Sequence, residues 1–199
     1  MQSHAHAPES RRVLVSIWAC ILSFDASCRQ ELIKDKSHTY FLQYLIAKDT
    51  STQQRAKSAF VLTEICNGYK EGQQVCAQQG LHRACTSLLA PKNCTSKDLK
   101  KWLCLCLAKL CEDNPWARYL TIAEGGQHTQ LFPVLLHEDP GVRACAALAL
   151  GEIFGASDII NPAGTSGNHS PSGTGPSMSP MPRCIWLNMT KYTVQFSAY

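Results

Sequence analysis

The hydrophobic residues of this chain recur at helical spacing in segments of similar length. Three twelve-residue segments, 55–66, 100–111 and 143–154, align without gaps and begin 45 and 43 residues apart. Each begins with a basic residue, and its fifth position is small, its eighth is leucine and its eleventh is branched aliphatic. Apolar side chains at such spacing line one face of an α-helix. A period of about 40–47 residues between such helices is typical of HEAT and armadillo repeats.

The small fifth position of the aligned segments predicts a close crossing between stacked helices. It is occupied by Ala59, Cys104 and Ala147. A small side chain lets two helix backbones approach and lets the neighbouring leucines interdigitate. We therefore expect leucine in place of Ala147 to overpack the crossing, at a cost of about 1–3 kcal/mol. The leucine and branched aliphatic positions are Leu62, Leu107, Leu150, Ile65, Leu110 and Ile153.

The apolar run at residues 11–24, "RRVLVSIWACILSF", is in register with these segments. Its first residue lies 44 residues before Arg55. In that register Val15, Trp18 and Ile21 occupy the three core positions. A signal peptide has no reason to match helices further along the chain. We therefore interpret the run as the first helix of a repeat array.

A secreted glycoprotein is the alternative interpretation of the same run. Two arginines, an apolar stretch and the small residues Ala26 and Ser27 fit the pattern of a signal peptide. Eleven cysteines and Asn-x-Ser/Thr sequences at Asn93, Asn168 and Asn188 would fit a disulfide-bonded, glycosylated product. However, the cysteine count is odd, no Cys-x-x-Cys occurs, and the thiols fall inside apolar stretches. A free cysteine in such a stretch behaves as a small hydrophobic residue, which favours the helical interpretation.

Shorter apolar segments between the long helices predict a second set of helices. They span residues 30–47, 73–90 and 118–136, and each is interrupted near its middle. Gly80 and Gly126 lie at two of the interruptions, where the left-handed end of a helix favours glycine. Each unit is therefore predicted to contain a long helix followed by a broken or double one.

Local signals for helix ends fall where this repeat places them. Asp139 and Asn114 each precede a proline, which puts a capping side chain directly before the first helical position. Thr95 and Asp98 predict an approximate capping box ahead of the third long helix. Arg143 follows Asp139 by four residues, and we expect it to bond within its repeat or with the neighbouring one.

These elements predict an all-α fold, a HEAT/armadillo-like helical-repeat solenoid of about three and a half repeats. The repeats are expected to span residues 11–156, after a disordered N-terminus at residues 1–10. Residues 157–199 begin with a run rich in glycine, serine and proline. Such a composition buries too little apolar surface to offset the cost of ordering, so we expect a disordered tail.

Composition and charge exclude some classes of function. The chain has 199 residues, of which 45% are hydrophobic and 17% charged, enough for one globular domain. Its net charge is +4, but two of the basic residues, Arg183 and Lys191, lie in a final segment without acidic residues. No basic stripe interleaved with aromatic residues occurs, so nucleic-acid binding is not expected. The longest apolar run is too short to span a bilayer.

No catalytic or cofactor-binding motif occurs in the sequence. The patterns of serine hydrolases, P-loop nucleotide-binding proteins and zinc proteases are absent. His82, Cys85 and Cys76 form one loose group, whereas a structural zinc site usually needs two closely spaced pairs of ligands. We expect these three side chains in the helical core or on its surface. The chain is predicted to bind no cofactor and no metal and to have no enzymatic activity.

Two groups of residues are candidates for contact or modification. Lys97, Lys100 and Lys101 form the densest basic cluster in the helical part. They indicate either a solvated face or a binding site for an acidic partner. Ser170 and Ser179 each precede a proline in the predicted tail, where proline-directed phosphorylation would be accessible.

Four runs carry a resemblance to a known family. They are "VLVSIWACILSFDASCRQELIKDKSHTYFLQYL", "AFVLTEICNGYKEGQQVC", "KKWLCLCLAKLCEDNPWAR" and "DPGVRACAALALGEIFG". Trp18, the Asn-Gly-Tyr turn, the Trp-Leu-Cys helix and the Pro-x-Val-Arg entry appear in order at family spacing. In these runs, over roughly residues 12–156, the chain resembles the HEAT/armadillo region of the Raptor family, the scaffold subunits of TOR complex one.

The resemblance implies a non-enzymatic scaffold in nutrient-responsive TOR signalling. Such a protein binds the TOR kinase, presents substrates to it and meets the Rag GTPases through its helical region. It implies a cytoplasmic protein that is recruited to the lysosomal surface without inserting into the membrane. Nothing in the sequence resembles the family's caspase-like domain or its WD-type propeller. A generic armadillo-type adaptor with a different cargo is the alternative.

Overall fold

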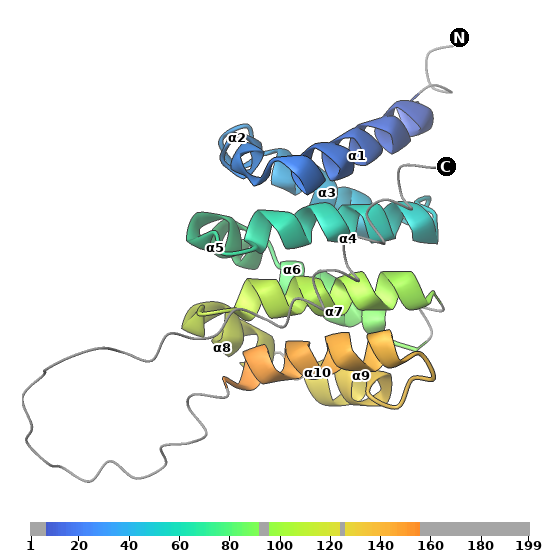
Figure 1. The fold of residues 1–199 in the computed structure, drawn as a ribbon, viewed down its shortest axis with the longest axis vertical. Coiled ribbons are helices and arrows are strands. Elements are labelled where there is room, and N and C mark those ends of the chain that lie inside the picture. Colours follow the sequence, from blue (N-terminus) through green and yellow to red (C-terminus); the bar gives the residue numbers. More distant parts are fainter. Residues whose placement is uncertain (1–6, 92–95, 124–125, 156–199) are drawn as a thin grey trace, which may run out of the picture. The chain divides into compact units, whose positions relative to one another are not determined.

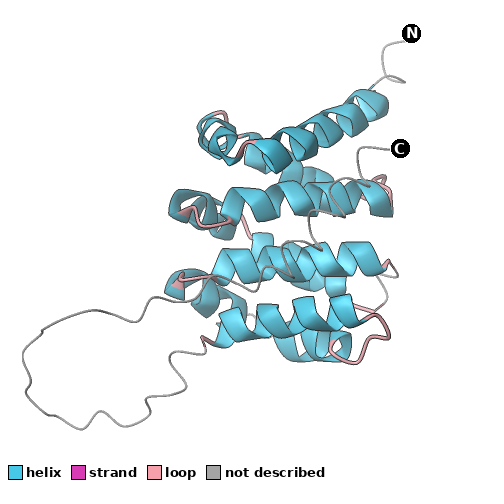
Figure 2. Cartoon of the chain, viewed as in Figure 1, coloured by secondary structure: helices cyan, strands magenta, loops and turns pink. Residues whose placement is uncertain are grey.

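The structure of this protein is a computed structural model that describes residues 7–91, 96–123 and 126–155 (Figure 1). Within these ranges the chain forms helices and turns, with no strand (Figure 2). The helices are α1 (Ala7–Phe24), the short 3-10 helix η1 (Ala26–Cys28), α2 (Arg29–Lys34), α3 (Ser37–Ile46), α4 (Thr52–Cys66), α5 (Lys70–Gln78), α6 (Leu81–Leu89), α7 (Lys97–Cys111), α8 (Pro115–Ala123), α9 (Gly126–Val134) and α10 (Pro140–Phe154).

The helices are arranged in two layers (Figure 1). The long helices α1, α4, α7 and α10 pack side by side in chain order, each against the next. Behind them, α3, α6 and α9 form a second row, and α2, α5 and α8 pack on one another in the same order. A long helix with a shorter pair therefore makes one unit. Three units followed by α10 confirm the predicted all-α helical-repeat fold.

The opening apolar run forms most of α1, and α1 packs against α4 as a repeat helix does. This contact confirms that the run is the first helix of the stack. The helix begins at Ala7, four residues before the predicted boundary at residue 11. Pro8 lies in the first turn, where a proline removes no intrahelical hydrogen bond.

Two predicted helix starts are confirmed by their hydrogen bonds. Asp139 Oδ1 and Asn114 Oδ1 each accept a hydrogen bond from the backbone N–H three residues further on, at 3.1 Å. Each bond satisfies a donor that has no partner inside the helix. Gly80 has the left-handed conformation expected at the break between α5 and α6, with φ of 80°. The third unit's break falls at residues 124–125, outside the described residues.

The start of α7 differs from its prediction by one residue. Ser96, and not Thr95, is the capping residue, because the chain becomes helical at Lys97. The Ser96 hydroxyl accepts a hydrogen bond from the backbone N–H of Leu99, at 3.4 Å. Serine and threonine are both favoured at the N-cap of a helix, and the two residues are adjacent, so the prediction missed the cap by one position.

Two of the basic residues that open the long helices bind carbonyl groups of the chain segment that precedes them. Arg55 donates to the carbonyl oxygen of Ala47 at 2.7 Å. Arg143 donates to the carbonyl oxygens of His137 and Glu138, both at 2.8 Å. Arg143 therefore bonds within its own repeat, as expected. Ala47 follows the C-terminus of α3, where carbonyl groups have no partner inside the helix, whereas His137 and Glu138 lie in the loop between α9 and α10.

Burial of the long helices depends on their place in the stack. We number the helix positions from Arg11, Arg55, Lys100 and Arg143, so that the small residue is position 5. The interior helices α4 and α7 bury side chains on both sides. In α1 the buried residues lie at positions 5, 9 and 12, and in α10 they include those at positions 4, 7, 8 and 11. These residues are Val15, Ala19, Leu22, Ala146, Ala149, Leu150 and Ile153.

This pattern corrects three expectations about the core. Ala147, predicted to lie at a helix crossing, is exposed, because position 5 of α10 faces away from α7 and no described helix covers it. Trp18 and Ile21, predicted as core residues of α1, are only half-buried. Their positions are buried in the interior helices, where a preceding long helix covers them. Leucine at Ala147 is therefore not expected to overpack the stack.

Candidate protein-interaction surfaces

The predicted basic cluster lies where α7 meets the start of α10. Lys101 pairs with Asp139, with Nζ 3.2 Å from Oδ1, and only 12% of its side chain is exposed. Lys97 lies 4.0 Å from the other carboxylate oxygen of Asp139, and its side chain is mostly exposed. Lys100 is half-buried on the same turn of α7. The structure therefore brings two of the three lysines to one carboxylate, and the Lys101 charge is engaged within the chain.

Asp139 acts both as the cap of α10 and as the partner of these lysines. Burial alone would raise the pKa of Asp139, but the backbone N–H of Val142 and the ammonium of Lys101 together lower it. Gly141 leaves room for the lysine, since a Cβ there would lie 3.0 Å from Lys101 Cε. This corner is therefore a structural junction between two long helices. The surface that remains for a partner is the exposed part of Lys97 and Lys100.

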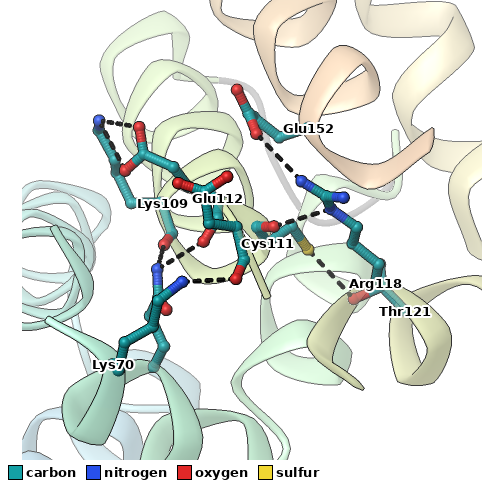
Figure 3. A network of polar contacts seen from close by, with 9 residues as sticks. Lys70, Lys109, Cys111, Glu112, Arg118, Thr121 and Glu152 are labelled. Carbon is teal, nitrogen blue, oxygen red and sulfur yellow. Dashed lines mark hydrogen bonds and ion pairs between the residues drawn. The ribbon is translucent and has the colours of Figure 1, made fainter. Parts of the chain in front are cut away.

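Side chains from α5 bind the carbonyl groups at the C-terminal end of α7 (Figure 3). The side-chain amide of Gln73 donates to the carbonyl oxygens of Lys109 and Glu112, at 2.8 and 2.9 Å. Lys70 donates to the carbonyl oxygen of Asp113. These carbonyl groups lie at the helix C-terminus and lack partners within the helix. The contacts therefore tie the second unit to the third through main-chain atoms.

Arg118 of α8 extends this junction to α10 (Figure 3). Its Nε donates to the carbonyl oxygen of Cys111 at 3.0 Å, and its guanidinium lies 3.8 Å from the carboxylate of Glu152. Burial, with repulsion from Glu112, raises the pKa of Glu152. Burial also raises the pKa of the Cys111 thiol to about 11, although the hydroxyl of Thr121 opposes the shift. The polar groups of this junction therefore bind one another and hold α7, α8 and α10 together.

A pair of aromatic residues on α8 differs from these engaged groups. Trp116 is 42% exposed and Tyr119 is 68% exposed, and we call them the α8 aromatic pair. The equivalent positions of α5, 45 residues earlier, carry the exposed polar residues Glu71 and Gln74. Because α5 is packed between α2 and α8, these positions face solvent even inside the stack. The exposure of the aromatic pair therefore does not come from a missing neighbour.

Sequence reasoning missed the aromatic pair, although the repeat alignment holds the signal for it. Aligning α8 with α5 sets Trp116 against Glu71 and Tyr119 against Gln74. An apolar residue at a position that is polar in another copy indicates a surface used for contact. Tryptophan and tyrosine are also enriched at the energetic centres of protein interfaces.

The candidate metal ligands are buried in the helical core. Cys76, Cys85 and His82 are all less than 5% exposed. The described cysteines are all free thiols, among them the exposed Cys20 of α1. Among the described residues, no group of three or more His, Cys, Asp or Glu side chains is placed to hold a metal ion.

Comparison with known proteins shows which proteins contain a similar helical-repeat segment. No family model matches the sequence. Regulatory-associated protein of TOR 2 from Oryza sativa subsp. japonica is 42% identical over 160 residues, which cover 78% of this chain and 12% of that protein. The raptor homolog of Dictyostelium discoideum is 38% identical over 152 residues, which cover 76% of this chain and 10% of that protein. The chain is homologous to a segment of the Raptor proteins.

Solved structures agree with the homology to Raptor. The crystal structure of Chaetomium thermophilum Raptor superposes with a TM-score of 0.69 at 30% identity, covering 80% of this chain and 15% of that one. An engineered protein superposes with a TM-score of 0.65 at 22% identity, covering 76% of this chain and 58% of that one, and shares the fold alone. The chain spans about a tenth of the length of the curated Raptor relatives.

The names of the Raptor relatives place them in TOR signalling. One relative from Schizosaccharomyces pombe, 32% identical over 155 residues, is a subunit of target of rapamycin complex 1, and the plant relatives are regulatory-associated proteins of TOR. The recognition made from the four runs is therefore confirmed for the helical-repeat region.

Several predicted features lie outside the described residues. They are the phosphorylation candidates Ser170 and Ser179, the three candidate glycosylation sites, and the tail at residues 157–199. These features stay predictions. Within the described part of the chain, no helix has the length and apolar character needed to cross a membrane.

Proposed function

We propose that this chain is a non-enzymatic scaffold module of TOR signalling that binds the TOR kinase and the Rag GTPases. The homology to Raptor proteins supports a place in the TOR complex. The observation that carries the binding role is the α8 aromatic pair, because it is exposed at positions that are polar in α5. The module is cytoplasmic, and protein contacts bring it to the lysosomal surface.

The aromatic pair fits a protein partner for energetic reasons. An exposed Trp or Tyr side chain offers a large apolar area at a low cost in conformational entropy, because it has few rotatable bonds. Its N–H or O–H group still forms hydrogen bonds at the edge of an interface. Trp116 and Tyr119 are three residues apart on one helix, so both rings reach the same partner surface.

Lys97 and Lys100 supply the second contact, with an acidic surface of a partner. Lys101 is not part of this contact, because its ammonium is held by Asp139 and is mostly buried. Exposed lysines contribute mainly to the rate of association and to specificity, so this contact adds less affinity than the aromatic pair. It is also weakened by salt.

The test measures binding of the purified 199-residue chain to the TOR kinase and to a Rag GTPase pair. Replacing Trp116 and Tyr119 together by alanine is expected to weaken at least one of these interactions by about tenfold or more. The matched control replaces Glu71 and Gln74 of α5 by alanine, at equivalent exposed positions. If the wild-type chain is folded and binds neither partner, the proposal is wrong.

The basic contact has a separate test. Lys97→Glu together with Lys100→Glu is expected to slow association and to reduce its dependence on salt. Lys34→Glu with Lys48→Glu is the control, because it makes the same change of charge at exposed lysines elsewhere. Equal effects of the two pairs would show that only net charge matters and would remove Lys97 and Lys100 from the contact.

A further inference from the structure

The turn between α4 and α5 contains an asparagine followed by a glycine, Asn67 and Gly68. This dipeptide occurs once in the sequence. Gly68 is exposed and has a positive φ of 63°, and a Cβ added there would meet no neighbouring atom within 4 Å. Glycine suits the conformation of this turn. Because Gly68 has no side chain, its backbone nitrogen is also sterically accessible to a neighbouring group.

The backbone N–H of Gly68 differs from the N–H groups on either side of it. The N–H of Asn67 donates to the carbonyl oxygen of Glu64, and the N–H of Tyr69 donates to that of Cys66. The N–H of Gly68 donates to no acceptor among the described residues. Attack of this nitrogen on the side-chain amide carbon of Asn67, Cγ, would close a five-membered ring. The turn therefore places a nitrogen without an acceptor next to an amide with which it is able to react.

Arg29 of α2 holds the peptide group between Asn67 and Gly68. Its guanidinium donates to the carbonyl oxygen of Asn67 and lies over the Tyr69 ring, with Cζ 6.0 Å from the ring centroid. Asn67 has a ψ of 100°, which turns its Cβ away from the Gly68 nitrogen. Ring closure needs these two atoms on the same side of the Cα–C bond, so the peptide group has to rotate first. Rotation moves the Asn67 carbonyl oxygen away from Arg29 and breaks their hydrogen bond.

We propose that Asn67 converts spontaneously to aspartate and isoaspartate through a cyclic imide, and that Arg29 slows this conversion by holding the turn. The Gly68 nitrogen forms a bond to Cγ of Asn67, and the bond from Cγ to the side-chain nitrogen breaks. That nitrogen takes up the proton of the Gly68 N–H and leaves as ammonia. Water then opens the imide at either carbonyl carbon, which gives aspartate by one route and isoaspartate by the other. The turn is thus a modification site that needs no enzyme and no reagent other than water.

The conversion changes the charges at the junction between α4 and α5. Burial raises the pKa of Glu64, and the side-chain amide of Asn67, which donates to the Glu64 carboxylate, opposes this shift together with Arg29 and Lys109. An aspartate at position 67 has no side-chain N–H to donate and adds a second negative charge beside Glu64. Isoaspartate also lengthens the main chain of the turn. Both products are expected to loosen α5, whose Gln73 ties the second unit to the third.

The first test follows Asn67 in the full chain during incubation in mildly alkaline solution. Proteolysis and mass spectrometry detect the exchange of the side-chain NH2 group for OH, and chromatography separates the aspartate peptide from the isoaspartate peptide. Asn114 is the control within the same chain, because Pro115 has no N–H and cannot lose a proton to close the imide ring. Asn67 is expected to convert while Asn114 stays intact. If Asn67 converts no faster than Asn114, the proposal is wrong.

The substitution Arg29→Ala tests whether Arg29 slows the reaction. Conversion of Asn67 is expected to be about tenfold faster, because losing a hydrogen bond from a charged group increases the population of the rotated turn. Lys34→Ala is the matched control on the same helix, since the exposed Lys34 ammonium binds Glu31. This control is expected to convert at the wild-type rate. Equal rates in Arg29→Ala and Lys34→Ala would contradict the proposal.

Hydrogen exchange separates local opening of the turn from unfolding of the chain. In Arg29→Ala, the amides in the middle of α4 are expected to exchange at the wild-type rate while Asn67 converts faster. If their exchange accelerates by the same factor as the conversion, Arg29 acts through the stability of the whole stack and the proposal is wrong. The wild-type chain unfolded in urea is expected to convert faster than the folded chain. Equal rates in the folded and unfolded chain would show that the turn is not held, which would also overturn the proposal.

Discussion

The interior helices α4 and α7 and the end helices α1 and α10 carry the same apolar pattern but bury it differently. Leu103, at position 4 of α7, is fully buried, whereas Leu14, at position 4 of α1, is 40% exposed. Ala59, at position 5 of α4, is buried, whereas Ala147, at position 5 of α10, is exposed. In a stack of repeats, each face is buried only when a neighbour packs on it. The pattern therefore indicates which faces are able to pack, and the neighbours determine which ones do.

The largest expected difference in the free energy of unfolding comes from replacing leucine by alanine at position 4 of an interior helix and of an end helix. Leu103→Ala should lower the free energy of unfolding by about 2–5 kcal/mol, because it leaves a cavity among buried side chains. Leu14→Ala should change it by about 0.5 kcal/mol or less, since the side chain already contacts solvent. Urea unfolding of dilute protein measures both values. Similar losses for the two variants would show that another part of the chain covers α1.

A second pair of substitutions adds volume at position 5. Ala59→Leu should destabilise the stack by about 1–3 kcal/mol, because the added atoms press on a filled crossing. Ala147→Leu should stay within about 0.5 kcal/mol of the wild type. This outcome reverses the expectation from sequence alone, in which Ala147 was the overpacked site. Thermal unfolding of both variants checks it, and a large loss for Ala147→Leu would place α10 inside a larger stack.

The elements that sequence predicted are those that follow from local pattern. The long helices and the caps at Asp139 and Asn114 depend on residues a few positions apart. The spacing of the repeat then placed the helices side by side. The choice between Thr95 and Ser96 as a cap was not predictable, because both residue types cap well and differ by one position.

The contacts that sequence did not predict join residues far apart in the chain. Lys101 meets Asp139 from 38 residues away, and Gln73 reaches the carbonyl oxygen of Lys109 from 36 residues away. A repeat period tells which helices are neighbours, but not which side chains on them meet. For this reason the members of the predicted lysine cluster differ in environment. Lys101 forms an ion pair with Asp139 and is mostly buried, whereas Lys97 is mostly exposed.

Removing the N-terminal cap of α10 or of α4 gives a third, smaller difference in the free energy of unfolding between an end helix and an interior one. Asp139→Ala should cost up to about 2 kcal/mol, because it removes both the cap and the partner of the mostly buried Lys101. Ser51→Ala removes the cap of α4, whose hydroxyl accepts from the backbone N–H of Gln54 at 3.4 Å. It should cost less, about 0.5–1 kcal/mol, because no second contact is lost. Urea unfolding compares the two, and equal losses would mean that the Lys101 contact adds no stability.

The second layer contains a contact between the first and second units that involves the ionisable ring of His38. The side-chain amide nitrogen of Gln79 lies 2.9 Å from Nε2 of His38 and 3.0 Å from the hydroxyl oxygen of Thr39. Because an amide N–H only donates, this contact requires an unprotonated Nε2 on the His38 ring. Burial also lowers the pKa of His38 below its ordinary value. The folded chain thus favours the neutral ring.

The smallest expected effect is the part of the pH dependence of the free energy of unfolding that comes from the His38 ring. The unfolded chain binds the proton more tightly than the folded one, so the contribution of His38 is fully present above about pH 6.5 and is lost as the pH falls toward the lower folded pKa. His38→Gln should remove this part of the pH dependence and leave the part that comes from carboxyl groups. Urea unfolding of both proteins between about pH 5 and pH 7.5 measures the two slopes. If the slopes are identical, the ring of His38 binds its proton equally well in both states, and the neutral contact with Gln79 does not hold the two units together.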